Sequence, residues 1–144
     1  MWQARHDIYW ALVQANPGLE AIATDVCVPI SNLAEAVGRA QDRAAEMGLQ
    51  APMLGHVGDG NFHATVFVDR NDAKAMAACE DYTAWIAELA IELDGTVTGE
   101  HGVGQGKVAS LVKEMGAATG VMSAIKSAID PLNIMNPGKV LMPE

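Results

Sequence analysis

The chain is poor in cysteine and in basic residues, and each scarcity excludes a class of protein. Cys27 and Cys79 are the two cysteines among 144 residues, and both lie in apolar segments without the spacing of metal ligands. We therefore expect reduced core thiols rather than a disulfide framework. Nine Lys and Arg against 18 Asp and Glu give a net charge of −9. This balance argues against a nucleic-acid-binding protein, because phosphates attract basic surfaces.

Long hydrophobic runs are also missing. No apolar segment approaches the roughly 20 residues that a membrane-spanning helix needs. The first six residues lack the charged-then-apolar layout of a signal peptide. Half of the residues are nevertheless hydrophobic and 19% are charged, a composition with which one domain of this length can bury a core. We therefore expect an acidic cytoplasmic domain.

Hydrophobic periodicity predicts alternating strands and helices. A helix is expected over residues 2–15, and strands at 24–30, 51–57, 62–68 and 96–98. A helix that starts with an Asn32–Glu35 capping box and stops at Gly48 follows the first strand, and a second long helix follows Asn71 or Asp72. This order is the split βαβ, or ferredoxin-like, arrangement, with additional C-terminal helices near 106–115 and 119–129. The predicted fold is therefore α+β, with an antiparallel sheet.

Two histidines flank the turn between the second and third predicted strands. If Asp59-Gly60 forms a two-residue hairpin turn, His56 lies opposite His63, and Val57 and Phe62 point to the core. Opposed residues have Cβ atoms roughly 4.5–5.5 Å apart, so both imidazoles can reach one divalent metal ion. A longer turn would shift this register. The alternative is that the two histidines merely flank a turn and bond to the backbone.

A second polar cluster follows the last predicted strand. Glu100 and His101 stand between glycines, where charged side chains are rarely needed for packing. Two neutral histidines and a carboxylate would leave an open coordination position, as catalytic metal sites require. The following run, 102–107, lacks the spacing of a phosphate-binding loop, because His101 stands where its first glycine is required. We interpret these glycines as a tight backbone beside the metal.

Arg5 is the other polar candidate, next to His6 and close to Trp2. Two interpretations stay open for it. It lies on a solvated helix face, or its guanidinium binds a carboxylate in a bidentate pair.

Three ordered motifs resemble the C-terminal domain of the FAD-linked oxidases, in the group of the D-2-hydroxyacid dehydrogenases. They are GHVGDGNFH at 55–63, GEHGVGQGK at 99–107 and DPLNIMNPGK at 130–139. The stretches around Arg5 and at 24–31 are most similar to the cytochrome-type D-lactate dehydrogenase branch. The resemblance covers the whole chain, so we expect residues 1–144 to be this domain. It implies that the N-terminal FAD-binding domain of the family lies outside these residues.

The resemblance implies a role for six residues. The implied ligands of a divalent metal, zinc or manganese, are His56, His63 and Glu100. His101 matches the general base that takes the hydroxyl proton while hydride leaves for FAD. Asn61 and Arg5 match groups that contact the substrate.

The implied function is the substrate- and metal-binding domain of a flavin-dependent enzyme that oxidises a small 2-hydroxyacid, D-lactate first, to a 2-oxoacid. Its partners would be the FAD-binding domain and a second copy in a homodimer, and the chain alone is expected to be inactive. Electron-transfer partners would place it at the periphery of the inner membrane. The alternatives are a glycolate oxidase flavin subunit, a D-2-hydroxyglutarate dehydrogenase domain, a non-catalytic metal-binding module and a metal-dependent hydrolase.

Overall fold

A computed structural model describes residues 2–141, with the side chains described from residue 7 onward. The chain begins with helix α1 (Trp2–Ala15), which confirms the first predicted helix. The four strands of the structure are β1 (Glu20–Ala23), β2 (Val26–Cys27), β3 (Met53–His56) and β4 (Asn61–Val68). The helices are α2 (Leu33–Glu46), preceded by the short turn η1 (Ile30–Asn32), α3 (Ala73–Glu92), α4 (Val108–Met115) and α5 (Ala118–Ile129).

Strand β4 lies at the centre of an antiparallel sheet. Phe62 pairs with both Val26 of β2 and Gly55 of β3, so these two strands lie on opposite edges of β4. β1 and β2 share one register along β4 and are linked by Thr24, whose backbone N–H donates to Ala64 O at 2.9 Å. The predicted split βαβ order is thereby confirmed, with one strand split in two.

Two of the predicted strands differ from the structure. The first begins at Glu20 rather than Thr24 and ends at Cys27 rather than Ile30. The segment 96–98 forms a single bridge, between Thr96 and Cys27, instead of a strand. The reason is that the backbone N–H of Val97 donates to the Glu114 carboxylate of α4, at 2.9 Å, rather than to a neighbouring strand.

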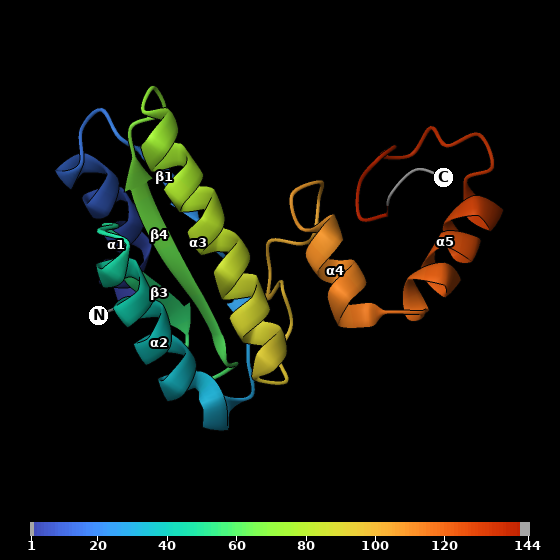
Figure 1. The fold of residues 1–144 in the computed structure, drawn as a ribbon, viewed down its shortest axis with the longest axis horizontal. Helices are drawn as coiled ribbons and strands as arrows, with labels where there is room; N and C mark the ends of the chain where they lie inside the picture. Colours follow the sequence, from blue (N-terminus) through green and yellow to red (C-terminus); the bar gives the residue numbers. More distant parts are fainter. Residues whose placement is uncertain (1, 142–144) are drawn as a thin grey trace.

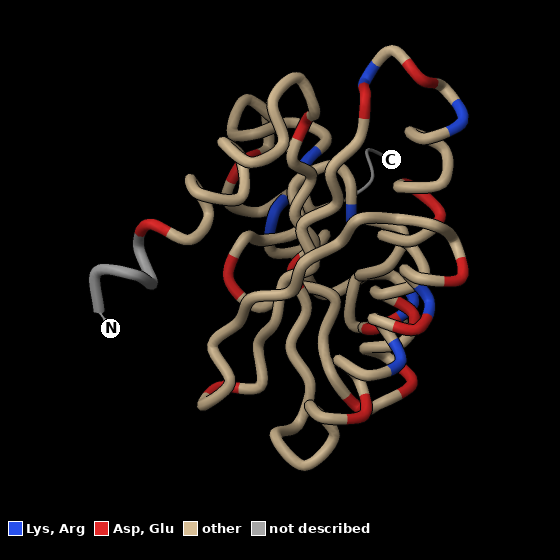
Figure 2. Tube along the Cα trace, turned by 90° about the vertical axis from the view of Figure 1, so that its left-hand side faces the viewer, with Lys and Arg blue, Asp and Glu red and all other residues tan. Residues whose placement is uncertain are grey.

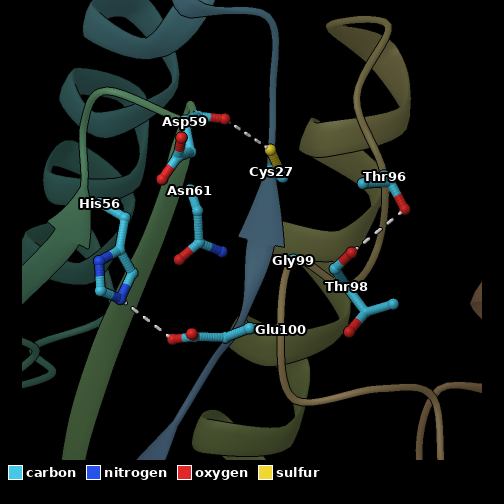
Figure 3. Close-up of a pocket in the computed structure, with 8 residues that line it drawn as sticks. All are labelled: Cys27, His56, Asp59, Asn61, Thr96, Thr98, Gly99 and Glu100. Atoms are coloured by element: carbon cyan, nitrogen blue, oxygen red, sulfur yellow. Dashed lines mark hydrogen bonds and ion pairs between the residues drawn. The ribbon is translucent and has the colours of Figure 1, made fainter.

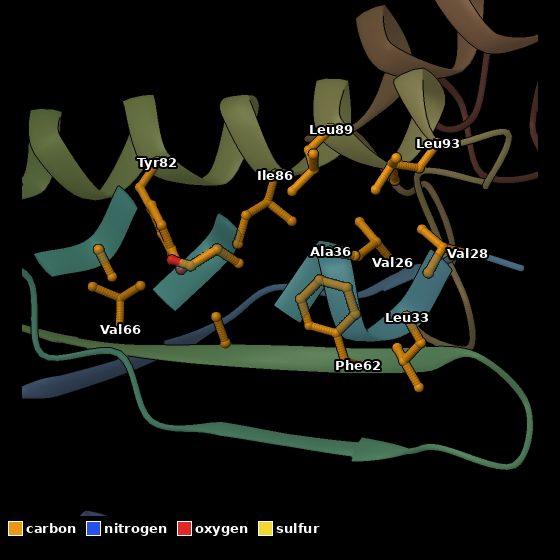
Figure 4. Packing of buried hydrophobic residues seen from close by; sticks show 14 of the residues in the cluster. Val26, Val28, Leu33, Ala36, Phe62, Val66, Tyr82, Ile86, Leu89 and Leu93 are labelled. Carbon is orange, nitrogen blue, oxygen red and sulfur yellow. Dashed lines mark hydrogen bonds between the residues drawn. The ribbon is translucent and has the colours of Figure 1, made fainter. Parts of the chain in front are cut away.

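The hydrophobic core lies between the sheet and the layer formed by α2 and α3 (Figures 1 and 4). Alternate residues of β4 face this layer, and all are buried: Phe62, Ala64, Val66 and Val68. Tyr82 of α3 crosses the core and donates its hydroxyl proton to the Ala40 carbonyl of α2 at 2.8 Å. A fully buried Phe or Val side chain contributes about 1.5–3 kcal/mol to stability, so this layer fixes the strand order on which the site depends.

The helix N-termini confirm one of the two predicted N-terminal caps. Asp72 caps α3 by accepting hydrogen bonds from the backbone N–H groups of Lys74 and Ala75. The predicted capping box at α2 is wrong, because Asn32 already has helical backbone angles. Its amide reaches across the domain instead and donates to Leu93 O at 3.0 Å. Gly48 ends α2 as expected, with a φ of 67°.

Helices α4 and α5 and the C-terminal segment lie beside the sandwich rather than on the sheet (Figure 1). Acidic positions are spread over the whole trace, and the fewer basic positions are scattered among them (Figure 2). None of the helices in the described part of the chain is both long and apolar enough to cross a bilayer.

Candidate functional site

The β3–β4 hairpin has a four-residue turn, 57–60, and not the predicted two-residue turn. His56 pairs with Asn61, and His63 pairs with Leu54. The predicted opposition of His56 and His63 is therefore wrong by two residues. Side chains alternate between faces with a period of two, so a shift of two keeps both histidines on one face. Their ring centroids lie 5.9 Å apart, which confirms the shared face.

The longer turn has a local cause. Asp59 N–H donates to His56 O at 2.8 Å, and Gly60 takes a left-handed φ of 76°. A Cβ on Gly60 would lie 2.0 Å from Val28 O, so this position packs directly on the strand end. Val57 lies in the turn and is 68% exposed, which contradicts its predicted place in the core, whereas Phe62 is buried as expected.

Glu100 lies between the two histidines. Its Oε1 atom is 3.2 Å from His56 Nε2 and 3.0 Å from His63 Nε2. His63 Nδ1 is 3.0 Å from the carbonyl oxygen of Thr24. A carbonyl can only accept, so Nδ1 donates to Thr24 O, while Nε2 faces the Glu100 carboxylate. The structure thus gathers the three predicted metal ligands around one point.

His101 lies beside this cluster. Its ring stacks on His63 with a centroid distance of 4.9 Å and an interplanar angle of 8°. Its Nε2 atom is 3.9 Å from the Glu100 carboxylate, beyond hydrogen-bond distance, and its side chain is half exposed. His101 is therefore oriented by packing and remains open to a ligand.

Asp25 is the site residue that the sequence analysis missed. It lies in the gap between β1 and β2 and is 1% exposed. Its carboxylate accepts hydrogen bonds from the Thr98 hydroxyl and the Asn61 amide, both at 2.8 Å. It also accepts from three successive backbone N–H groups, those of Gly99, Glu100 and His101, at 2.9 to 3.2 Å.

The charge of Asp25 is held by its surroundings. Burial alone raises the pKa of this carboxyl group, but the hydrogen bonds from His101 N–H, Thr98 and Asn61 and the charge of Lys107 together hold it well below its ordinary value. Lys107 Nζ donates to the backbone oxygen of Asp25 at 2.6 Å and lies 3.6 Å from the carboxylate. The lysine of the glycine-rich run is thus part of the internal structure, in line with our rejection of a phosphate-binding loop.

Asp25, His63 and His101 form a second group whose donor atoms lie within 4.8 Å of one another. The Asp25 oxygens already accept hydrogen bonds from five groups. A carboxylate offers about four lone-pair sites, so Asp25 has none left for a metal. The trio of His56, His63 and Glu100 is the better ligand set.

Two cavities adjoin the histidines. One, of about 300 Å³, is lined on one side by Cys27 and Gly99 and on the other by His56 (Figure 3). The buried Oδ1 atom of Asn61 lacks a hydrogen-bond partner among the described residues, and it points toward the space between His56 and Glu100 (Figure 3). Leaving a buried acceptor without a partner is unfavourable, so this atom is suited to a group that donates a hydrogen bond.

The other cavity, of about 580 Å³, lies on the α1 side of the histidines. Its apolar lining comes from three different elements and consists of Ile8, Tyr9, Ala23 and Leu54. The side chain of Arg5, the predicted carboxylate-binding residue, lies outside the described residues.

The glycines of the 99–106 loop serve different purposes. The predicted close backbone approach of the glycines in the 102–107 run is wrong, because a Cβ on Gly102, Gly104 or Gly106 would meet open space. Gly102 and Gly104 instead take left-handed φ values of 79° and 53°. The close approach lies at Gly99, where a Cβ would be 1.9 Å from the Asn61 amide nitrogen. A fully buried charge must be paired, so the aspartate inside an apolar strand was the signal that could have revealed Asp25.

The family described as "FAD linked oxidases, C-terminal domain" matches residues 1–140 of this chain. The "Probable D-lactate dehydrogenase, mitochondrial" of Danio rerio is 44% identical over 142 residues, which are 98% of this chain and 29% of that protein. "D-lactate dehydrogenase (cytochrome), mitochondrial" of Arabidopsis thaliana is 41% identical over 99% of this chain and 25% of its own length. "Glycolate oxidase subunit GlcD" of Bacillus subtilis is 41% identical over 96% of this chain and 29% of its own length. The chain therefore spans less than a third of the length of these relatives.

Proposed function

Because this chain belongs to the family of C-terminal domains of FAD-linked oxidases, we propose that it is the substrate- and metal-binding domain of a flavin-dependent D-2-hydroxyacid dehydrogenase. D-Lactate is the proposed substrate, and a separate N-terminal domain is proposed to hold the FAD. The observation that supports this assignment is the gathering of His56, His63 and Glu100 around one point, with His101 stacked beside them.

The spacing of the three proposed ligands fits a divalent cation. In tetrahedral zinc sites, ligand distances of about 2.0–2.2 Å place neighbouring donor atoms about 3.3–3.6 Å apart, and the two imidazole–carboxylate distances are only slightly shorter, at 3.2 and 3.0 Å. The Nδ1 proton of His63 is engaged by Thr24 O, which leaves Nε2 as the ligand atom. Nitrogen and oxygen donors suit zinc and manganese. When bound, the cation would supply positive charge beside the oxygen atoms of the substrate.

His101 is proposed as the general base. Histidine is the side chain best matched to accepting a proton near neutral pH. Packing against His63 fixes the ring, while half of the side chain stays accessible to a substrate hydroxyl. In this proposal His101 takes that proton as hydride leaves C2 of the substrate, and FAD is the hydride acceptor.

The cavities support a small substrate without a charged side chain. Ile8, Ala23 and Leu54 give the larger cavity an apolar wall that suits a methyl group. Asn61 is proposed to contact the substrate, and Arg5 is proposed to pair with its carboxylate. The net charge of −9 repels an anion at long range, so attraction must come from such local positive charge.

The exposed face of α5 supports docking against another folded unit. Val121, Ile125 and Ile129 recur at helical spacing and are 63%, 55% and 70% exposed. Contiguous exposed apolar surface of this kind marks interaction sites. We propose that it faces the FAD-binding domain in the longer protein; a homodimer and a cytoplasmic or membrane-peripheral location stay predictions.

A glycolate oxidase flavin subunit is the second candidate. The Bacillus subtilis relative that bears this name is 41% identical, and glycolate differs from lactate only in lacking the methyl group. In isolation, the chain would act as a metal-binding module without catalysis.

The test is a chimera in which this chain replaces the matching C-terminal part of the Danio rerio relative. We expect D-lactate-dependent dye reduction that exceeds the rate with glycolate, and a loss of at least 100-fold in kcat on His101→Ala. A folded, flavin-loaded chimera that oxidises neither acid would contradict the proposal. Higher activity with glycolate would favour the second candidate.

A further inference from the structure

The loop that carries Glu100 and His101 has no regular secondary structure, yet it must hold two of the proposed functional side chains in place. Three successive backbone N–H groups, from Gly99 to His101, point at one carboxylate. Such a run of N–H groups forms an anion-binding concavity. The anion that fills it here is the chain's own Asp25, 75 residues away from Glu100 in sequence.

The concavity is shielded from solvent, because Asp25 is 1% exposed. Without an anion, three N–H dipoles would converge on a buried point without an acceptor, which is unfavourable. A charged acceptor makes hydrogen bonds roughly twice as strong as a neutral one. The loop conformation therefore depends on the negative charge of Asp25 and not only on its shape.

Asp25 also lies next to one of the proposed ligands. His63 Nδ1 is 3.0 Å from Thr24 O and 3.7 Å from Asp25 Oδ1. The opposite ring nitrogen, Nε2, faces Glu100 at 3.0 Å. Asp25 and the residue before it therefore contact both the loop that carries Glu100 and the histidine that Glu100 approaches.

We propose that Asp25 is the positioning residue of this site: its buried carboxylate fixes the Glu100–His101 loop through the backbone and so holds Glu100 against His56 and His63. This inference rests on the proposed function for its metal and goes beyond it in assigning a residue that contacts neither metal nor substrate. Lys107 Nζ lies 3.6 Å from the same carboxylate oxygen that accepts from the loop, and balances its charge.

The test compares Asp25→Asn with Asp130→Asn. Asp130 is a matched control, because it is also buried, pairs with a lysine and accepts from two backbone N–H groups, those of Ile134 and Met135. Supporting groups of metal ligands typically contribute 10- to 100-fold to affinity. We expect zinc affinity in calorimetric titration to fall by that factor in Asp25→Asn and by less than 2-fold in Asp130→Asn.

One readout does not need the metal. In metal-free protein, amide hydrogen exchange at 99–101 should accelerate at least 10-fold in Asp25→Asn and not in Asp130→Asn. If the wild type binds neither zinc nor manganese, the proposed metal site fails, while this measurement still decides the role of Asp25.

A folded Asp25→Asn protein with unchanged exchange rates at 99–101 would overturn the inference. If this variant does not fold, Thr98→Val decides instead, because it removes one donor to Asp25 and retains the charge. It should accelerate exchange at 99–101 by a smaller factor, about 3-fold, and unchanged exchange there would equally overturn the inference.

Discussion

Replacing Gly99 by alanine tests how tightly the 99–101 loop is packed on Asp25. The added Cβ would lie 1.9 Å from Asn61 Nδ2, 2.8 Å from Asn61 Cγ and 2.9 Å from Asp25 Oδ1. Asn61 is 5% exposed and cannot swing into solvent. Gly99 does not take a left-handed φ, so the backbone itself accepts alanine. The predicted effect is therefore purely steric.

The magnitude follows from what must move. Displacing the Asn61 amide breaks its hydrogen bonds to Asp25 Oδ1 and Val26 O, and a bond to a charged acceptor contributes about 1.5–3 kcal/mol. Overpacking of a buried site costs about 1–3 kcal/mol more. We therefore expect Gly99→Ala to lower the free energy of unfolding by roughly 3–5 kcal/mol, a large part of the 5–15 kcal/mol typical of a domain.

Urea unfolding followed by circular dichroism measures this difference. Gly106→Ala is the matched control in the same loop, because it also lacks a left-handed φ and its Cβ would meet open space. Reduced freedom of the unfolded chain should make that variant neutral or up to about 1 kcal/mol more stable. A Gly99→Ala protein within 1 kcal/mol of the wild type would refute the steric argument.

Three further predictions concern the ligands and the core. His63→Ala should abolish most zinc affinity in calorimetric titration, whereas His101→Ala should change it by less than about 3-fold; equal losses would contradict the division between ligand and base. Wild-type affinity should also weaken as the pH falls, because protons compete with the metal for imidazole nitrogen. Burial raises the pKa of Tyr82 from 10.0 to about 12, so the neutral phenol is favoured in the folded state. The contribution of this raised pKa to the free energy of unfolding is complete below pH 10. It is lost as the pH rises toward 12, by roughly 3 kcal/mol. Unfolding free energies measured at pH 9 and pH 12 for the wild type and Tyr82→Phe should show this difference only in the wild type.

The sequence pattern predicted the sheet and its helices because their periodicity is strong. It located the first strand too late, since Glu20 and Ala21 have weak strand propensity and pair only because β4 offers an eight-residue partner. It also predicted a strand at 96–98 that does not form, for the opposite reason: the residue types there favour a strand. Val97 is β-branched and buried, but its backbone bonds to Glu114 and not to another strand.

The candidate site was predictable to the extent that it depends on alternation along a strand. His56 and His63 share a face whether the turn has two or four residues, so an incorrect register still gave the correct face. The contact of Glu100 with both rings was predictable only from the order of the strands in the sheet. Its place inside an apolar strand indicated that Asp25 is paired, but not with what, because three of its five donors are backbone N–H groups, which leave no signature in residue type.

Strand β4 separates the two functions of this domain. Its residues at even positions, such as Val66, face the helices and form the core. Asn61, His63 and Thr65 occupy the other face, and all three are largely buried there, although each is polar. Buried polar groups are mostly paired: the Asn61 amide donates to Asp25 Oδ1 and Val26 O, and His63 Nδ1 lies 3.0 Å from Thr24 O. The break between β1 and β2 is therefore part of the candidate site, because the Thr24 carbonyl there contacts the histidine and the Asp25 carboxylate accepts from the loop.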